Sequence, residues 1–106
     1  MKKIFNKLVR DKIPEIISRE DRTCKTRVLC DEEFLVELNK KLSEEFAEYL
    51  ESGDAEELAD IMEVISAILD VKKVSREKVE EIRRAKADKN GAFKKRLFLI
   101  EADSKN

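Results

Sequence analysis

Residues 41–65 read KLSEEFAEYLESGDAEELADIMEVI, and this stretch decides the fold. Apolar residues recur at helical spacing from Leu35 to Tyr49 and again from Leu58 to Leu69. Ser52-Gly53 separates the two patterns, and glycine readily adopts the left-handed backbone conformation that ends a helix. Because so short a connection forces its flanking helices to run antiparallel, the sequence predicts a helical hairpin over about 31–71.

Start and stop signals define the hairpin helices and predict two further helices. Asp31 is the expected N-cap of the first long helix, and Asp54 with Glu57 matches a capping-box variant at the start of the second. A short helix is expected from Pro14 to about Arg19, and a third long helix from Ser75 to Asn90-Gly91. We therefore expect an all-α fold.

Two segments outside the helices carry residues that favour extended backbone. A short strand is expected within residues 22–30, and the apolar run at 97–100 is either a short strand near 96–101 or a tail packed on the helices. No linker or internal repeat interrupts the chain. We therefore expect a single domain over residues 1–106.

The composition agrees with a small helical protein and excludes several chemistries. Of the 106 residues 44% are charged and 42% hydrophobic, with only 2 Gly and 1 Pro, which disfavours a turn-rich sandwich or barrel. There is no His, so Ser-His and Cys-His catalysis and His-ligated zinc are absent. Cys24 and Cys30 do not match a C-x-x-C site, and we expect them to be ordinary reduced thiols.

No segment of the sequence suggests a membrane location. The longest uncharged stretch near the middle, residues 64–69, is far shorter than the roughly 20 apolar residues that span a bilayer. The basic first residues reach another charge before an apolar signal region forms. We expect a cytoplasmic protein that does not bind membranes.

The charges are segregated along the chain although the formal net charge is only -1. Residues 42–71 carry ten acids and no base, whereas the rest of the chain carries 14 acids and 23 bases. A nucleic acid would need a continuous basic face, so nucleic-acid binding is not expected. This layout instead suits an anion that is held through a metal cation and contacted by outlying Lys and Arg.

The acids beside the turn are spaced to converge. Glu48 is expected opposite Glu57 across the hairpin, and Glu45 opposite Asp60. Within each helix the two acids are three residues apart, which places them on one face. Packing four carboxylates together costs free energy, because desolvation and repulsion both oppose their ionisation. A divalent cation such as Mg²⁺, which prefers oxygen ligands and bridges carboxylates to phosphates, would reverse that cost.

A solvated acidic helix face is the competing interpretation of these residues. Acids near helix ends are common, and Glu57 also has a capping position. Two features count against this interpretation. The facing acids have no Lys or Arg at i+4, and Glu57 and Asp60 flank the apolar stripe of their helix instead of lying opposite it.

At these acids the sequence resembles the all-α nucleoside triphosphate pyrophosphohydrolases, which include MazG, the phosphoribosyl-ATP pyrophosphohydrolases and the dimeric dUTPases. The signature of that family is E-E-x-x-E followed by E-x-x-D, which here reads Glu44-Glu45-Phe46-Ala47-Glu48 and Glu57-Leu58-Ala59-Asp60. The eight residues between the two halves are fewer than in many members. FNKLVRDKIPEII (5–17) and NGAFKKRLF (90–98) also resemble a MazG-like subgroup labelled phosphoribosyl-ATP pyrophosphohydrolase-like, so the resemblance covers most of the chain.

The resemblance implies a Mg²⁺-dependent enzyme, with Mn²⁺ as a substitute, that hydrolyses a nucleotide between its α- and β-phosphates. Glu45, Glu48, Glu57 and Asp60 would bind the metal, and Glu44 would lie beside them, either to support a metal ligand or to orient the attacking water. Glu44, Glu45 and Glu48 are thus the candidate catalytic residues. Nucleoside monophosphate and pyrophosphate would leave without a covalent enzyme intermediate.

Phosphate groups need cationic partners, and the candidates lie outside the acidic hairpin. The four residues that we select for substrate binding are Arg10, Lys12, Lys86 and Arg96. Aromatic residues can stack on a nucleotide base, but three are instead expected in the core: Phe5, Tyr49 and Phe93.

The expected helices leave too little apolar surface covered for a lone chain of this length. Two long apolar-striped helices in 106 residues form a thin core, and such helices commonly bury their remaining apolar face against a partner. We therefore expect a homo-oligomer that completes a four-helix-bundle-like arrangement. The resemblance implies a dimer or tetramer.

Two other functions stay open from the sequence. Phosphoribosyl-ATP pyrophosphohydrolase of histidine biosynthesis uses the same acids on a larger substrate, and the motif does not separate it from an enzyme of nucleotide-pool housecleaning. A non-catalytic helical interaction module would instead use the acidic hairpin to bind a basic partner. That module predicts no Mg²⁺-dependent stabilisation and no turnover.

Overall fold

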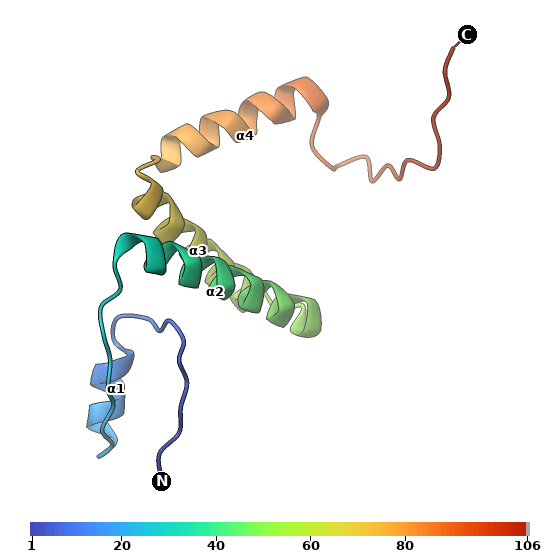
Figure 1. Ribbon diagram of the computed structural model, residues 1–106. Helices are drawn as coiled ribbons and strands as arrows, with labels where there is room; N and C mark the ends of the chain where they lie inside the picture. The colour runs from blue at the N-terminus through green and yellow to red at the C-terminus, as the bar shows by residue number, and fades with distance from the viewer. Residues whose placement is uncertain (106) are drawn as a thin grey trace. The chain divides into compact units, whose positions relative to one another are not determined.

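The computed structural model describes residues 1–105, which form four helices and no strand. The helices are α1 (Ile13–Arg19), α2 (Asp31–Ser52), α3 (Ala55–Lys72) and α4 (Arg76–Asn90) (Figure 1). The all-α class is confirmed, whereas the short strands expected near 22–30 and 96–101 do not form. The chain divides into two compact units, Met1–Val74 and Ser75–Asn106, and each is described by itself. A single domain over 1–106 stays a prediction.

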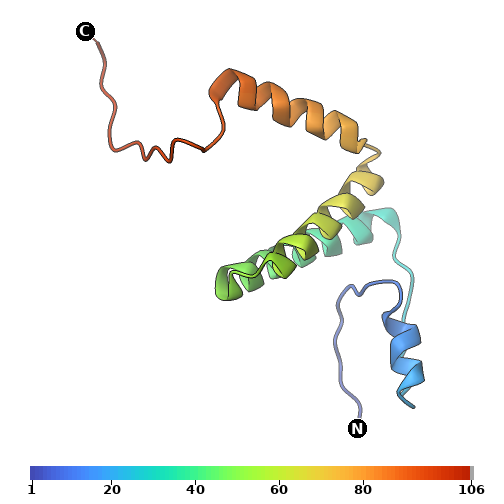
Figure 2. The same ribbon diagram turned by 180° about the vertical axis from the view of Figure 1, so that it is seen from behind.

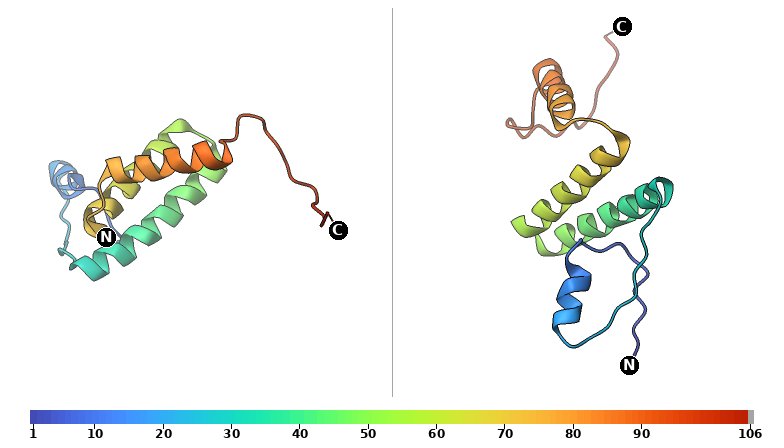
Figure 3. Two further views of the ribbon diagram at one scale, coloured as in Figure 1. Left: turned by 90° about the horizontal axis from the view of Figure 1, so that it is seen from above. Right: turned by 90° about the vertical axis from the view of Figure 1, so that its left-hand side faces the viewer.

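Helices α2 and α3 pack against each other as the predicted antiparallel hairpin (Figure 3). Gly53 ends α2 with φ +70°, in the left-handed region, and its N–H donates to the carbonyl of Tyr49 at 2.7 Å. The next N–H, that of Asp54, donates to the Ser52 hydroxyl at 3.1 Å. These local bonds close the turn, so the chain reverses within two residues.

Two predicted caps of the hairpin helices are wrong in detail. Cys30 occupies the N-cap of α2, one residue before the predicted Asp31. Asp54 is the N-cap of α3, but its side chain makes no capping hydrogen bond, so the capping box with Glu57 does not form. The N–H of Glu57 instead donates to the backbone carbonyl of Asp54 at 3.1 Å.

The core of the hairpin is thin. Leu38 of α2 and Val64 of α3 are the buried apolar side chains within residues 1–105. Other apolar residues of the same helices are exposed, among them Leu50 at 66% and Met62 at 70%. The hairpin therefore forms with much of its apolar surface open to solvent.

The three aromatic residues expected in the core are not buried. Phe5 and Phe93 are exposed, and Tyr49 is half-buried. The ring of Phe5 instead carries the Lys3 ammonium 5.1 Å from its centroid. The sequence pattern cannot separate a core aromatic from an exposed one in segments without helical periodicity.

Residues 1–12 belong to the first unit and approach the hairpin before turning back into α1 (Figure 2). Asn6 has φ +45°, which bends this segment. Two of its side chains make ion pairs with the hairpin, Lys7 with Glu44 and Arg10 with Asp60. The N-terminal segment is thus held against the hairpin by charge.

The second unit consists of α4 and the segment after it. Ser75 is the N-cap of α4, as predicted at its start, and its hydroxyl accepts a hydrogen bond from the Lys78 N–H at 3.0 Å. Gly91 ends the helix with φ +86°. The apolar residues at 97–100 are exposed, so they form neither a strand nor a packed tail.

Each helix within residues 1–105 is too short or too polar to cross a bilayer.

Candidate functional site

The predicted acids of the hairpin converge. Glu44, Glu45 and Glu48 of α2 each place a carboxylate oxygen within 4.8 Å of the other two, and Glu45 does the same with Glu57 and Asp60 of α3. We call these five residues the carboxylate cluster. Glu45 belongs to both groups of three and therefore lies at the centre.

Glu45 is the buried member of the cluster, with 7% of its surface exposed. One of its carboxylate oxygens, Oε1, lies 3.5 Å from the Lys41 ammonium. The other, Oε2, is buried and has no hydrogen-bond partner within the part of the chain that the structure describes. Burial, and then the neighbouring Glu48 carboxylate, raises the pKa of Glu45. A buried oxygen without a donor is costly, and a bound cation would satisfy it.

Glu57 lies on α3, and its ionisation is also opposed by its surroundings. Desolvation, followed by repulsion from Asp60 and Glu45, raises its pKa. Carboxylates at the centre of the cluster thus hold protons more tightly than isolated acids. A bound divalent cation would remove this repulsion, and carboxylate oxygens are the donors that Mg²⁺ and Mn²⁺ prefer. The residues present therefore fit a magnesium site.

Three cations surround the cluster. Arg10 Nη2 donates to Asp60 Oδ1 at 2.8 Å, and the Lys7 and Lys41 ammonium groups lie 3.6 and 3.7 Å from Glu44 Oε1. Lys41 lies three residues before Glu44 and four before Glu45, so helical spacing predicts its contacts with both acids, and the sequence analysis did not include them. No local pattern predicts a contact between Arg10 and Asp60, which are fifty residues apart.

The four predicted substrate-binding residues do not all reach the cluster. Arg10 does, through Asp60. Lys12 is exposed at the N-cap of α1. Lys86 in α4 and Arg96 after it belong to the second unit, so their predicted role rests on the sequence alone.

A cleft of about 200 Å³ lies between residues 6–8 and α2, beside the carboxylate cluster. Its lining includes Lys7, Lys40 and Lys41 together with Glu44. Glu37 also lines the cleft, and each of the three ammonium groups pairs with a carboxylate, so the wall carries both charges.

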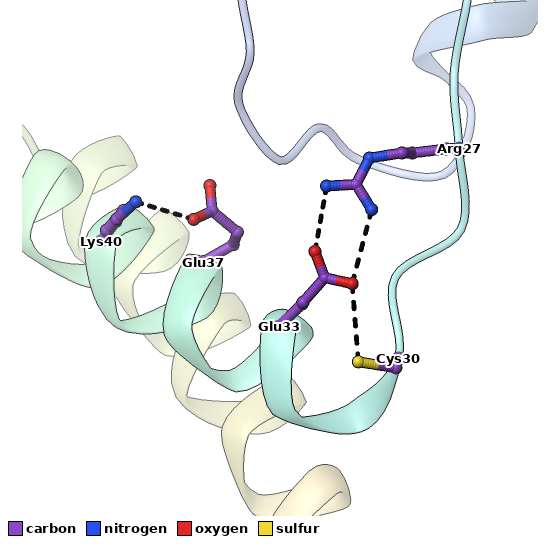
Figure 4. Close-up of polar contacts among 5 residues, drawn as sticks. All are labelled: Arg27, Cys30, Glu33, Glu37 and Lys40. Carbon is purple, nitrogen blue, oxygen red and sulfur yellow. Dashed lines mark hydrogen bonds and ion pairs between the residues drawn. The ribbon is translucent and has the colours of Figure 1, made fainter.

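A second set of interacting polar residues lies at the start of α2, and none of them belongs to the carboxylate cluster (Figure 4). Arg27 pairs with Glu33 through Nη2 and Oε2 at 3.0 Å, and the Cys30 thiol donates to the same carboxylate at 3.5 Å. These hydrogen bonds lower the pKa of Glu33. The group fastens the preceding segment to α2. Cys30 and Cys24 are both free and exposed thiols.

Comparisons with known proteins leave the family open. No family model matches the chain, and no solved structure matches it. An uncharacterized protein of Mycolicibacterium smegmatis is 46% identical over 52 residues, which are 49% of this chain and 52% of the relative. The chain thus spans about half the length of that curated relative.

Proposed function

We propose that this protein is a Mg²⁺-dependent nucleoside triphosphate pyrophosphohydrolase, which cleaves the α-β phosphoanhydride to give nucleoside monophosphate and pyrophosphate. The observation that carries the proposal is the buried Glu45, whose Oε2 has no partner within the described residues and whose carboxylate is shared by two groups of three converging acids. The order and spacing of these acids supply the second support, through the resemblance to the all-α pyrophosphohydrolases.

Glu45, Glu48, Glu57 and Asp60 would hold the magnesium ion. Glu45 joins them, because its carboxylate lies within one group that includes Glu48 and within another that includes Glu57 and Asp60. When bound, the ion would supply a Lewis acid and lower the pKa of a coordinated water. Glu44, the remaining acid of the cluster, is half-buried and is assigned to orient the attacking water by accepting a hydrogen bond.

Cationic side chains beside the cluster would bind the phosphate groups and stabilise the charge that develops on the leaving pyrophosphate. Arg10 and Lys41 already lie next to cluster acids, and Lys7 and Lys40 line the adjoining cleft. Lys12, Lys86 and Arg96 are further candidates from the sequence. Polyphosphate is the ligand class that matches a metal site bordered by several ammonium groups.

The protein would act as a dimer or tetramer. Phe46 and Leu50 of α2 and Leu58, Met62 and Ile65 of α3 are apolar and exposed. In each helix these residues are three or four positions apart, so they form a stripe on one side. Covering the stripes with a second hairpin would complete a four-helix bundle and bury apolar surface that the single chain leaves in water.

The proposal is tested by pyrophosphate release from a panel of canonical and modified nucleoside triphosphates, with and without Mg²⁺. We expect release to require the metal and to fall at least about 100-fold in Glu48→Gln, which removes one metal ligand. Glu63→Gln, an exposed acid of α3 outside the cluster, is the matched control and should retain full activity.

Other outcomes of this assay would redirect the assignment. Release from phosphoribosyl-ATP but from no nucleoside triphosphate would place the enzyme in histidine biosynthesis. No release from any of these compounds, with no Mg²⁺-dependent stabilisation, would contradict the enzyme proposal and favour an acidic interaction module.

A further inference from the structure

Arg10, in the irregular segment before α1, contacts an acid of the carboxylate cluster. Its guanidinium donates from Nη2 to Oδ1 of Asp60 at 2.8 Å, although fifty residues separate the two in sequence. Asp60 is also one of the three acids, with Glu45 and Glu57, whose oxygens converge within 4.8 Å. A positive side chain therefore contacts a carboxylate that is assigned to hold a cation.

A cation can replace Arg10 in this ion pair, because the pair is exposed and weak. Arg10 is 61% exposed and Asp60 31% exposed as side chains, so water reaches both partners. An exposed pair of this kind changes an equilibrium constant by no more than about fivefold. A divalent ion with several carboxylate ligands interacts more strongly with the same carboxylate. Arg10 can thus satisfy Asp60 without blocking the site permanently.

The segment that carries Arg10 has a second attachment. Lys7 lies 3.6 Å from Glu44, so residues 7–10 contact α2 and α3 of the hairpin through one ion pair each. Glu44 keeps a second cation, Lys41 at 3.7 Å, when Lys7 leaves. Asp60 has no such alternative among the ion pairs of residues 1–105. Loss of the Arg10 contact therefore leaves Asp60 without a neutralising cation, whereas loss of the Lys7 contact does not do so for Glu44.

We propose that Arg10 is a built-in counterion of the metal-free site, which competes with a divalent cation for Asp60 and is released when the cation binds. This inference rests on the proposed metal site but concerns a different residue and a different state. Because coupling between two binding events is reciprocal, the ion pair weakens metal binding by the same factor by which metal binding weakens the ion pair. The N-terminal segment thereby becomes free to contact the anion that the metal brings.

The competition is tested by titrating the full chain with MgCl₂ alone and measuring the Mg²⁺ affinity by isothermal titration calorimetry. Arg10→Ala should bind Mg²⁺ about twofold to fivefold more tightly than the wild type, since it removes the competing cation. Arg22→Ala is the matched control, because Arg22 is also an exposed arginine in one ion pair, with Glu20, away from the cluster. Arg10→Lys keeps the charge and should stay near wild-type affinity.

The outcomes separate this inference from the proposed function. Equal or weaker Mg²⁺ binding by Arg10→Ala, with the wild type binding normally, overturns the counterion role and leaves the metal site standing. A lower melting temperature of metal-free Arg10→Ala without any gain in affinity shows a structural role instead, and also overturns the inference. Absence of Mg²⁺ binding in every variant rejects the metal site itself and the inference with it.

Discussion

At the scale of single residues, Glu45 explains both the cost and the use of the candidate site. It lies among four other acids, is almost fully buried and has one oxygen without a donor. Such a group destabilises a metal-free protein, because its desolvation is not balanced by hydrogen bonds. Natural chains commonly keep such a cost where a ligand removes it.

The raised pKa of Glu45 gives a pH prediction with a definite sign. The folded protein holds this proton more tightly than the unfolded chain, where the ordinary glutamate value of 4.5 applies. The stabilising effect is therefore full below that value and is lost as pH rises through the raised folded pKa. Metal-free Glu45→Gln should be more stable than the wild type by about 1 kcal/mol at pH 7.5, and the difference should vanish at pH 4.

Urea unfolding followed by circular dichroism in the presence of EDTA measures this difference. Glu51→Gln, an exposed acid of α2 outside the cluster, should show no such pH-dependent gain. Added Mg²⁺ should reverse the order by stabilising the wild type alone. An equal difference in the free energy of unfolding at both pH values would show that ionisation of Glu45 does not destabilise the folded protein.

At the scale of elements, the turn between α2 and α3 sets the register of the cluster. Gly53 adopts φ +70°, and an added Cβ would meet no atom within 4 Å. The glycine is needed for its backbone conformation and not for space. The turn aligns Glu45 with Glu57 and Asp60 across the hairpin, so the turn and the site depend on the same short segment.

Gly53→Ala should therefore destabilise the protein by about 1 kcal/mol, which is the cost of a left-handed L-residue. The melting temperature should fall by about 4–8 °C for a chain of this size. Gly53→Asn should lose clearly less, because asparagine tolerates this conformation. Thermal melts by circular dichroism at equal protein concentration provide the test, and identical melts for the alanine variant and the wild type would contradict the left-handed turn.

At the scale of the whole molecule, the thin core points to association. Two buried apolar side chains among residues 1–105 are few for a stable domain, and the exposed stripes of α2 and α3 provide further apolar surface to bury. We expect the wild type to sediment as a dimer or tetramer at micromolar concentration. A monomer under these conditions would contradict the bundle.

Met62→Lys places a charge in the α3 stripe and should weaken association at least about tenfold, because it removes an apolar side chain that association would bury and adds a desolvation cost. Glu63→Lys changes the neighbouring exposed position and should leave the assembly intact. Sedimentation velocity over a concentration series distinguishes the two variants. Equal weakening by both substitutions would place the interface away from the stripe.

The sequence alone determined the helices, their hairpin turn and the identity of the five acids. These features are local: helical hydrogen bonds join residues four apart, a glycine ends a helix within one turn, and acids three apart share a face. Even the end of the hairpin, expected at about residue 71, was predicted within one residue of the end of α3 at Lys72. The capping box failed because nearby backbone and hydroxyl groups compete for the same N–H donors.

Only the tertiary structure decided which acid is buried and which cations neutralise the others. The packing of α3 on α2 buries Glu45 and leaves Glu48 exposed. The contact of Arg10 with Asp60 depends on the path of an irregular segment, which no periodicity encodes. Burial and long-range pairing are properties of how elements pack, whereas helix formation is a property of neighbouring residues, and this physical difference separates what the sequence predicted from what the fold added.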